Sequence, residues 1–267
     1  MKRKKRRFLY TVAVIIIVIV ALHVASRLLL RPNVLDIEDT HPFILKTTWH
    51  QTGDYARHVT YDNDVGCWAT AIGQISHHHQ LDPSGTIEYE TSEGYAISED
   101  FDDYLFNHEQ FPNAIDAQTP ETSKEQVAKY LYCIAALIYT DFGSSGYLEH
   151  ETMVSRIEGH LDCSVDFHEY QKQSYSSAQD EIKELIKNEI DAQRPLMFYF
   201  DNGKDFGHAA ALDGYIEQGD RFFVHLNMGW GGHYDGWYDP FKKIIGARDD
   251  LQNRFIMTFK PNEMQMF

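Results

Sequence analysis

The sequence predicts an α+β domain in which helices precede an antiparallel sheet, with one membrane-spanning helix in front of the domain. Apolar residues recur at helical spacing in several segments between residues 67 and 193, and short apolar or alternating runs separated by Gly, Asp and Asn lie between 196 and 259. Helices first and strands later, without regular alternation, favour an α+β domain over a doubly wound sheet. Residues 8–26 contain no Lys, Arg, Asp or Glu, which predicts the membrane helix.

The N-terminal end divides into a basic tail and an apolar segment. Residues 2–7 are all Lys or Arg, and a helix over 8–26 spans roughly 29 Å, about one hydrocarbon thickness. Basic clusters stay in the cytoplasm, which places the rest of the chain outside. We therefore expect a cytoplasmic tail over 1–7, a single-pass anchor over 8–30, a spacer over 31–47 and an extracytoplasmic domain over 48–267.

A cleaved signal peptide is the alternative to a retained anchor. Signal cleavage needs small residues at positions −3 and −1. Ala25 suits −1, but His23 then stands at −3, and the apolar run is long for a signal. The pattern favours the anchor, whereas cleavage would give a secreted protein.

The domain behind the anchor is strongly acidic. The tail holds six of the 24 Lys and Arg residues, and the chain has 40 Asp and Glu residues, so the remainder carries a formal charge of about −22. Such a domain repels nucleic acid and anionic headgroups. We expect no nucleic-acid partner.

Four segments have the pattern of helices. The first begins at Cys67 and has Ala71, Ile72 and Ile75 on one face. After it, residues 83–120 indicate loops and short elements. Ser123 and Gln126 have the spacing of a capping box ahead of an apolar face that runs to Ile138. A loop over 142–146 follows, and helical spacing returns at 153–161 and 178–193.

The remaining apolar runs predict an antiparallel sheet. They are short, and turn-forming residues separate them. The expected strands cover residues 196–200, 209–216, 222–226 and 255–259.

The three cysteines are Cys67, Cys133 and Cys163, with no CxxC pair, so at least one thiol is expected to be free. Cys133 lies in an apolar helical run and Cys163 in a half-buried strand pattern; a disulfide between them stays open. Cys67 is the thiol left over. It follows Gly66, which permits a sharp turn, and it falls in the first turn of a helix, where the macrodipole favours a thiolate.

A histidine and an asparagine far along the chain complete a candidate nucleophilic site. His208 lies between Gly207 and three alanines, whose small size leaves room for another segment beside the ring. Asn227, at the end of a predicted strand, can accept a hydrogen bond from the imidazole, while Trp230 shields that bond from water. Gln51 can donate to a developing oxyanion together with the Cys67 N–H.

Together these segments resemble the streptopain (C10) family of cysteine peptidases. The nucleophile end is similar in Trp49-x-Gln51 and in Gly66-Cys67-x-Ala69-Thr70-Ala71-x-x-Gln74-Ile75, closed by His79-Gln80. The histidine segment is similar in Gly207-His208-Ala209 with Asp213-Gly214-Tyr215. The Gly/Trp loop is similar in His225-x-Asn227-x-Gly229-Trp230-Gly231-Gly232, followed by Asp235-Gly236-Trp237-Tyr238. Residues 142–146 resemble the loop that borders the substrate cleft.

The resemblance implies a papain-like fold, with a helical subdomain carrying Cys67 against an antiparallel sheet carrying His208. Cys67 would be the nucleophile and His208 the general base and acid. Gln51 would donate to the oxyanion, and Asn227 with Trp230 would support His208. The implied substrate is a protein or peptide, bound near the substrate-contacting residues Ser145, Gly146 and Gly207. No cofactor is implied.

The chain departs from the family pattern in four places. Thr52 to Ala56 replace the usual Pro-aromatic-Asn, and Met228 replaces the first Trp of the Gly/Trp loop. Tyr147 and Leu148 stand where small residues are usual, which narrows the expected pocket. Many relatives carry a long inhibitory propeptide, and the segment from Arg31 to the Trp49 block is too short for one. Either the enzyme is not made as a zymogen, or a separate inhibitor chain restrains it.

Two other functions share these residues. A catalytically inactive relative could bind peptides or an adhesion partner in the same cleft. A thiol acyltransferase or amidase would share the first half-reaction. A metal centre at His77, His78 and His79 is not expected, because consecutive residues on a helix point in different directions.

Overall fold

The computed structural model describes residues 42–61, 63–144, 146, 152–171, 177–203, 206–242, 244 and 253–262. The predicted basic tail, the anchor over 8–30 and the spacer up to residue 41 lie outside these ranges. Within the ranges, none of the helices has the length and apolar character needed to cross a membrane. The described part is an α+β fold with antiparallel sheets, as predicted.

The helices are α2 (Cys67–His78), α3 (Glu121–Leu137), α4 (Met153–His160) and α6 (Gln179–Asp191). A short 3-10 turn, η1 (Gly53–Ala56), precedes α2, and two more, η2 (Phe101–Asp103) and η3 (His108–Gln110), lie between α2 and α3. The four predicted helices are all present. The predicted capping box is wrong, however, because α3 starts two residues before Ser123, and the Gln126 side chain instead bonds the backbone of Asn107 and Leu105.

The strands form a hairpin and one large sheet. The hairpin pairs β1 (Thr86–Glu90) with β2 (Ala96–Asp100), inside the stretch expected to hold short elements. The six-stranded antiparallel sheet has the order β3-β8-β4-β5-β6-β7. Its strands are β3 (Cys163–Gln171), β4 (Leu196–Asp201), β5 (Gly207–Gln218), β6 (Arg221–Asn227), β7 (Gly236–Tyr238) and β8 (Asn253–Pro261). The four expected strands are β4, β5, β6 and β8, and β5 begins early enough to include His208.

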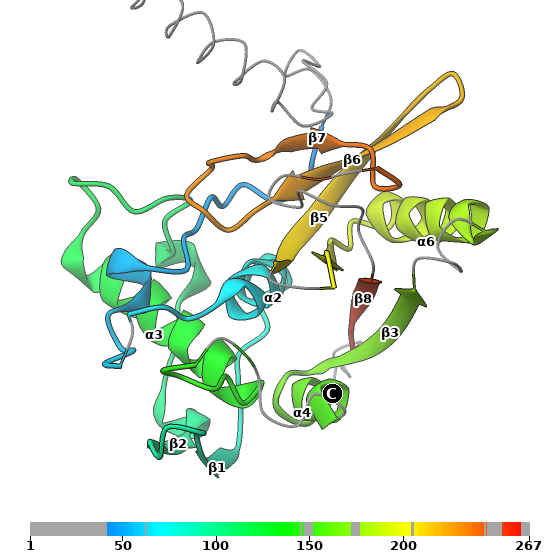
Figure 1. Ribbon diagram of the computed structural model, residues 1–267. Coiled ribbons are helices and arrows are strands. Elements are labelled where there is room, and N and C mark those ends of the chain that lie inside the picture. The colour runs from blue at the N-terminus through cyan, green and yellow to red at the C-terminus, as the bar shows by residue number, and fades with distance from the viewer. Residues whose placement is uncertain are drawn as a thin grey trace, which may run out of the picture.

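Helix α2 lies at the centre of the fold, between α3 and the sheet (Figure 1). All its residues from Trp68 to Ser76 are buried. On the α3 side, a Cβ at Gly73 would come within 2.5 Å of Leu131 Cδ2, so Leu131 of α3 occupies the space that a side chain at this position would need. On the other side, α2 packs against β5, whose Ala209 and Ala211 belong to the same buried cluster as α2. Buried on both sides, α2 provides a rigid base for Cys67 at its first residue.

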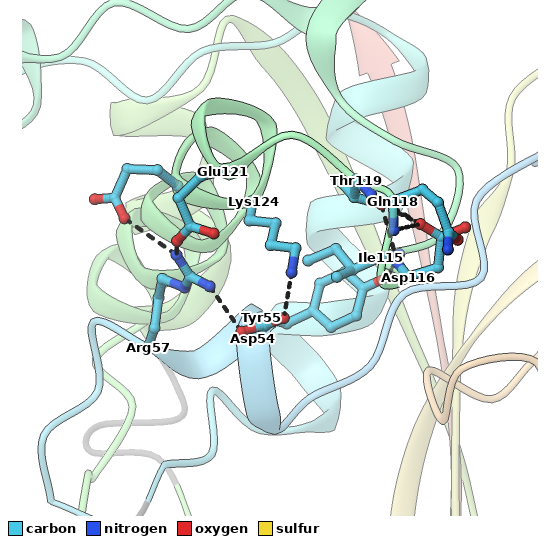
Figure 2. Close-up of polar contacts among 10 residues, drawn as sticks. Asp54, Tyr55, Arg57, Ile115, Asp116, Gln118, Thr119, Glu121 and Lys124 are labelled. Atoms are coloured by element: carbon cyan, nitrogen blue, oxygen red, sulfur yellow. Dashed lines mark hydrogen bonds and ion pairs between the residues drawn. The ribbon is translucent and has the colours of Figure 1, made fainter.

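A polar network ties the segment after Gln51 to the start of α3 (Figure 2). Arg57 pairs with Asp54 at 2.7 Å and with Glu121, and Lys124 pairs with Asp54 at 3.2 Å. The Tyr55 hydroxyl accepts a hydrogen bond of 2.7 Å from the Ile115 backbone. These contacts fix η1, and with it the chain that leads away from Gln51, against the helical subdomain.

Candidate active site

Cys67 is the first residue of α2 and lies half-buried where the helix meets β5. Gly66 precedes it with φ +85°, a left-handed conformation that glycine adopts without strain. The Cys67 Sγ accepts a hydrogen bond of 3.4 Å from the backbone N–H of Ala209. Because Ala209 follows His208 in β5, the thiol at the start of α2 contacts the backbone next to the predicted histidine.

The imidazole of His208 is buried and held from behind by a backbone carbonyl. Its exposed fraction is 4%, its Nε2 lies 2.8 Å from the carbonyl oxygen of Met228, and Trp230 packs against the ring at 4.3 Å between centroids. A carbonyl can only accept, so Nε2 carries the hydrogen and Nδ1 is the basic nitrogen of the neutral ring.

The expected hydrogen bond between Asn227 and His208 is not formed. The Asn227 side chain donates to the Thr47 carbonyl at 2.6 Å and exchanges two bonds of 3.1 Å with Gln74 of α2, and its Oδ1 also accepts from Gly229 at 3.1 Å. Asn227 thus fixes the loop whose next residue supplies the carbonyl. The sequence prediction assigned the acceptor to Asn227, one residue before Met228. A backbone carbonyl is present in every residue, so residue type cannot predict which one accepts.

Gln51 lies beside the turn that leads into Cys67. Its backbone carbonyl accepts from Val65 at 2.9 Å, and its Nε2 donates to Asp64 Oδ2 at 3.0 Å. The other carboxylate oxygen, Asp64 Oδ1, accepts from the Gly66 N–H at 2.7 Å. Asp64 is a site residue that sequence reasoning missed. The available signal was an acidic residue two positions before the glycine of the nucleophile turn.

The strand-like segment around Gln51 connects the two loops of the site. On one side, Thr52 forms an antiparallel bridge with Asp64. On the other, His50 forms a bridge with Trp230, and the Gly231 N–H donates to the Trp49 carbonyl at 3.1 Å. The nucleophile turn and the loop that holds His208 are therefore joined through one backbone segment.

This geometry favours the neutral forms of both Cys67 and His208. Burial raises the pKa of the Cys67 thiol, the Ala209 N–H opposes that rise, and the nearby Asp64 carboxylate adds to it. Burial also lowers the pKa of His208 to about 4, although the Met228 carbonyl favours the protonated ring. No hydrogen bond joins Sγ to the imidazole between these two described residues. The effect of the helix N-terminus, which favours a thiolate, is thus outweighed by burial.

The expected substrate-contacting residues have different surroundings. Gly207 opens β5 next to His208, and a Cβ there would come within 2.2 Å of the Tyr199 hydroxyl. Gly146 follows α3, and its carbonyl accepts from Asp141 at 3.1 Å. A Cβ at Gly146 would meet no atom within 4 Å. Ser145 lies outside the described residues.

The other two cysteines and His77 of the histidine run pack in or against the core. Cys133 and Cys163 are buried free thiols, so no disulfide joins them, and burial raises the pKa of each to about 12. His77 packs on Trp49 and shares a hydrogen bond of 2.7 Å with His108. Among the residues that the structure describes, no group of His, Cys, Asp and Glu is arranged to hold a metal ion.

Comparison with known families matches residues 47–238 to the model of the peptidase C10 family. Streptopain of Streptococcus pyogenes is 25% identical over 190 residues, covering 65% of this chain and 45% of streptopain. The thiol protease/hemagglutinin PrtT of Porphyromonas gingivalis is 26% identical over 180 residues, covering 64% of this chain and 20% of that protein. The chain therefore spans less than half the length of these curated relatives.

Solved structures agree on the fold. The active wild-type interpain A cysteine protease of Prevotella intermedia superimposes with a TM-score of 0.62 over 81% of this chain and 93% of that chain, at 20% identity. A prointerpain A fragment from the same organism gives a TM-score of 0.60 over 84% of this chain and 75% of that one, at 19% identity. At these identities the likeness concerns the fold.

Proposed function

Because the chain belongs to the peptidase C10 family, we propose that it is a cysteine peptidase that cleaves peptide bonds through a thioester on Cys67. The observation that carries this proposal is the contact between the Cys67 Sγ and the N–H of Ala209, the residue after His208. This contact supports the proposal because it joins the thiol to the strand residue next to His208. The Met228 carbonyl binds Nε2 of His208, which leaves Nδ1 as the nitrogen that could accept the thiol proton.

In the first half-reaction, the thiol proton moves to Nδ1 of His208 as Sγ attacks the peptide carbonyl carbon. The ring comes within hydrogen-bond reach of Sγ when substrate binds, since such contacts are often long in free enzymes. Thiolate and imidazolium then stabilise each other in a buried site, which offsets the cost of burying either charge alone. The new C–S bond pushes an electron pair onto the carbonyl oxygen.

That oxyanion needs hydrogen-bond donors, and the site offers two candidates. The Cys67 N–H belongs to the first helical residue and has no acceptor within the helix. The Gln51 amide carries a second hydrogen besides the one it gives to Asp64. Collapse of the intermediate expels the amine, which takes its proton from Nδ1. Water, deprotonated by Nδ1, then attacks the thioester and releases the acid and the thiol.

A catalytically inactive peptide-binding relative is the second candidate. The raised pKa of Cys67 and the lowered pKa of His208 favour it, because they hold the pair neutral in the absence of substrate. Hydrolysis of fluorescently labelled casein by the full chain separates the two functions. If the chain is a peptidase, the parent and the Cys133→Ala variant cleave casein, and the Cys67→Ala variant does not. Binding of casein without cleavage would leave the inactive relative.

We further propose that the peptidase domain is anchored to a membrane and faces away from the cytoplasm. The support is in the sequence: the basic run over 2–7 and the uncharged run over 8–26. Protease added to intact cells that express the full chain should digest the domain without lysis. A domain that is protected until the cells are lysed would contradict this orientation, and a domain found free in the medium would indicate cleavage.

A further inference from the structure

We propose that Asp64 is a positioning residue of this site: its carboxylate orients the Gln51 amide and the Gly66 turn, so that the Gln51 amide and the Cys67 N–H are held ready for the same substrate oxygen. The inference rests on the proposed peptidase function. Asp64 contacts the Gln51 amide and the Gly66 N–H. It acts through two neighbours.

The carboxylate contacts one candidate oxyanion donor, the Gln51 amide, directly. It acts on the other, the Cys67 N–H, through the preceding residue, Gly66. Oδ2 accepts from Gln51 Nε2 at 3.0 Å, and Oδ1 accepts from the Gly66 N–H at 2.7 Å. Gly66 is the residue before Cys67, so its orientation sets the plane of the peptide that carries the Cys67 N–H. Two oxygens on one rigid group thus fix the spacing between the two donors.

The charge of Asp64 decides which end of the Gln51 amide faces the turn. A carboxylate accepts hydrogen bonds and donates none, so it selects Nε2 over Oε1. The oxygen Oε1 is buried and has no hydrogen-bond partner, which leaves the contact with Asp64 as the polar contact that sets the orientation of the amide. A reversed amide would bring an oxygen, rather than a donor, toward a developing oxyanion.

The backbone around Asp64 makes the arrangement stiff. The bridge from Thr52 to Asp64 and the bond from Val65 to the Gln51 carbonyl keep the two segments in register. The same segment is bridged to Trp230, which packs on His208. A change at Asp64 therefore acts on the geometry of the oxyanion donors more than on the placement of the imidazole.

The negative charge of Asp64 also has an effect that works against the reaction, because it disfavours the thiolate form of Cys67. Its carboxylate raises the pKa of Cys67, behind the larger effect of burial. Tyr199 on β4 is a further titratable group that interacts with the thiol, and His208 is the neighbour in sequence of Ala209, whose N–H binds Sγ. Removing the charge of Asp64 should thus make the thiol easier to deprotonate while making the oxyanion harder to stabilise. A purely structural residue would weaken both properties together.

The test compares Asp64→Asn with the parent in the full chain, using casein turnover and the pH profile of iodoacetamide alkylation at Cys67. We expect kcat to fall at least tenfold with KM within about threefold, while the alkylation profile moves to lower pH. In a Gln51→Ala background, Asp64→Asn should cause less than a threefold further loss of kcat. Asp220→Asn, which removes an exposed carboxylate from the β5–β6 turn, is the charge control and should change neither readout.

Unchanged kcat in Asp64→Asn, or an equal loss with and without Gln51, would overturn the role of Asp64 while leaving the peptidase function intact. A parent chain that alkylates at Cys67 but cleaves no substrate would overturn the proposed function and this inference with it. If Asp64→Asn does not fold, Asp64→Ser replaces it, because the serine hydroxyl can still accept from the Gly66 N–H. The same outcomes decide the proposal.

Discussion

The imidazole of His208 is held by the backbone carbonyl of Met228, at 2.8 Å from Nε2, and not by the side chain of Asn227. The position where the family pattern has a tryptophan therefore contributes through its main chain, which any residue provides. The Met228 N–H is fixed in turn by Asp235 Oδ1 at 2.7 Å. With both polar groups of its backbone bonded, Met228 provides a rigid acceptor despite its different side chain.

Asn227→Ala should cost stability without changing the titration of His208. The substitution leaves buried partners in Gln74, Thr47 and Gly229 unpaired, at about 1–3 kcal/mol for each group that stays unsatisfied. Urea unfolding measures the loss, and the His208 ring signals in NMR spectra recorded against pH measure the titration. A shift in the His208 pKa beyond one unit would mean that Asn227 acts on the ring directly.

Acid should destabilise the domain in the window from pH 6.5 down to 4. Burial lowers the pKa of His208, His77 and His79 to about 4 from 6.5. The unfolded chain binds more protons in this window, so these groups favour folding fully above pH 6.5 and lose that contribution as the pH falls. For His208 alone the loss reaches about 3 kcal/mol at pH 4.

The free energy of unfolding in urea at pH 8, 6 and 5 tests this expectation. His208→Gln should be less stable than the parent at pH 8 but should lose less on acidification, since one proton-linked group is gone. His233→Gln, which replaces a histidine of the exposed turn before β7, is the control. Parallel pH profiles for His208→Gln and the parent would contradict the burial argument.

The helices and the central strands could be predicted from the sequence because their signals are local. Ala71, Ile72 and Ile75 repeat at helical spacing and are buried in α2, and the apolar runs of β4 to β6 correspond to strands buried on both faces. The β1–β2 hairpin gave little signal, since a single residue of each strand, Ile87 or Ile97, is buried. Periodicity cannot reveal a strand with one apolar residue.

The parts of the site that escaped prediction depend on contacts between loops. Cys67 and His208 were predicted from residue type, spacing and family resemblance. The pairing of Gln51 with Asp64 joins two irregular segments, and the Met228 carbonyl is a group that every residue has. Neither contact follows from residue type or periodicity. Similarly, burial of Cys67 depends on how closely α2 approaches β5, which the sequence does not state.

Gly73→Ala should destabilise the packing of α2 on α3. The added Cβ would lie 2.5 Å from Leu131 Cδ2, and overpacking of a buried contact costs about 1–3 kcal/mol. Combining it with Leu131→Val, which shortens the facing side chain, should recover part of the loss. Gly159→Ala in α4 is the matched control: its Cβ meets no atom within 4 Å, and alanine should stabilise this exposed helical position by up to about 1 kcal/mol. Thermal unfolding of the parent and the three variants measures these differences, and equal effects at both glycines would contradict the close approach of Leu131 to Gly73.

Gly207→Ala should reduce peptidase activity by crowding the residue before His208. A Cβ at Gly207 would lie 2.2 Å from the Tyr199 hydroxyl and 3.0 Å from its Cζ, and the aromatic ring is confined between Trp68 and Phe255. To relieve this clash, either the Tyr199 ring or the first residues of β5, which include His208, must shift. We expect kcat/KM on casein to fall about tenfold or more.

The Tyr199 hydroxyl makes this expectation specific. Tyr199→Phe removes the atom in closest contact, so it should restore part of the activity of Gly207→Ala while changing the parent little. The residual contact with Cζ sets the limit of that rescue. If the double variant is no more active than Gly207→Ala, the glycine is needed for another reason, such as direct contact with substrate, and casein KM rather than kcat should then carry the loss.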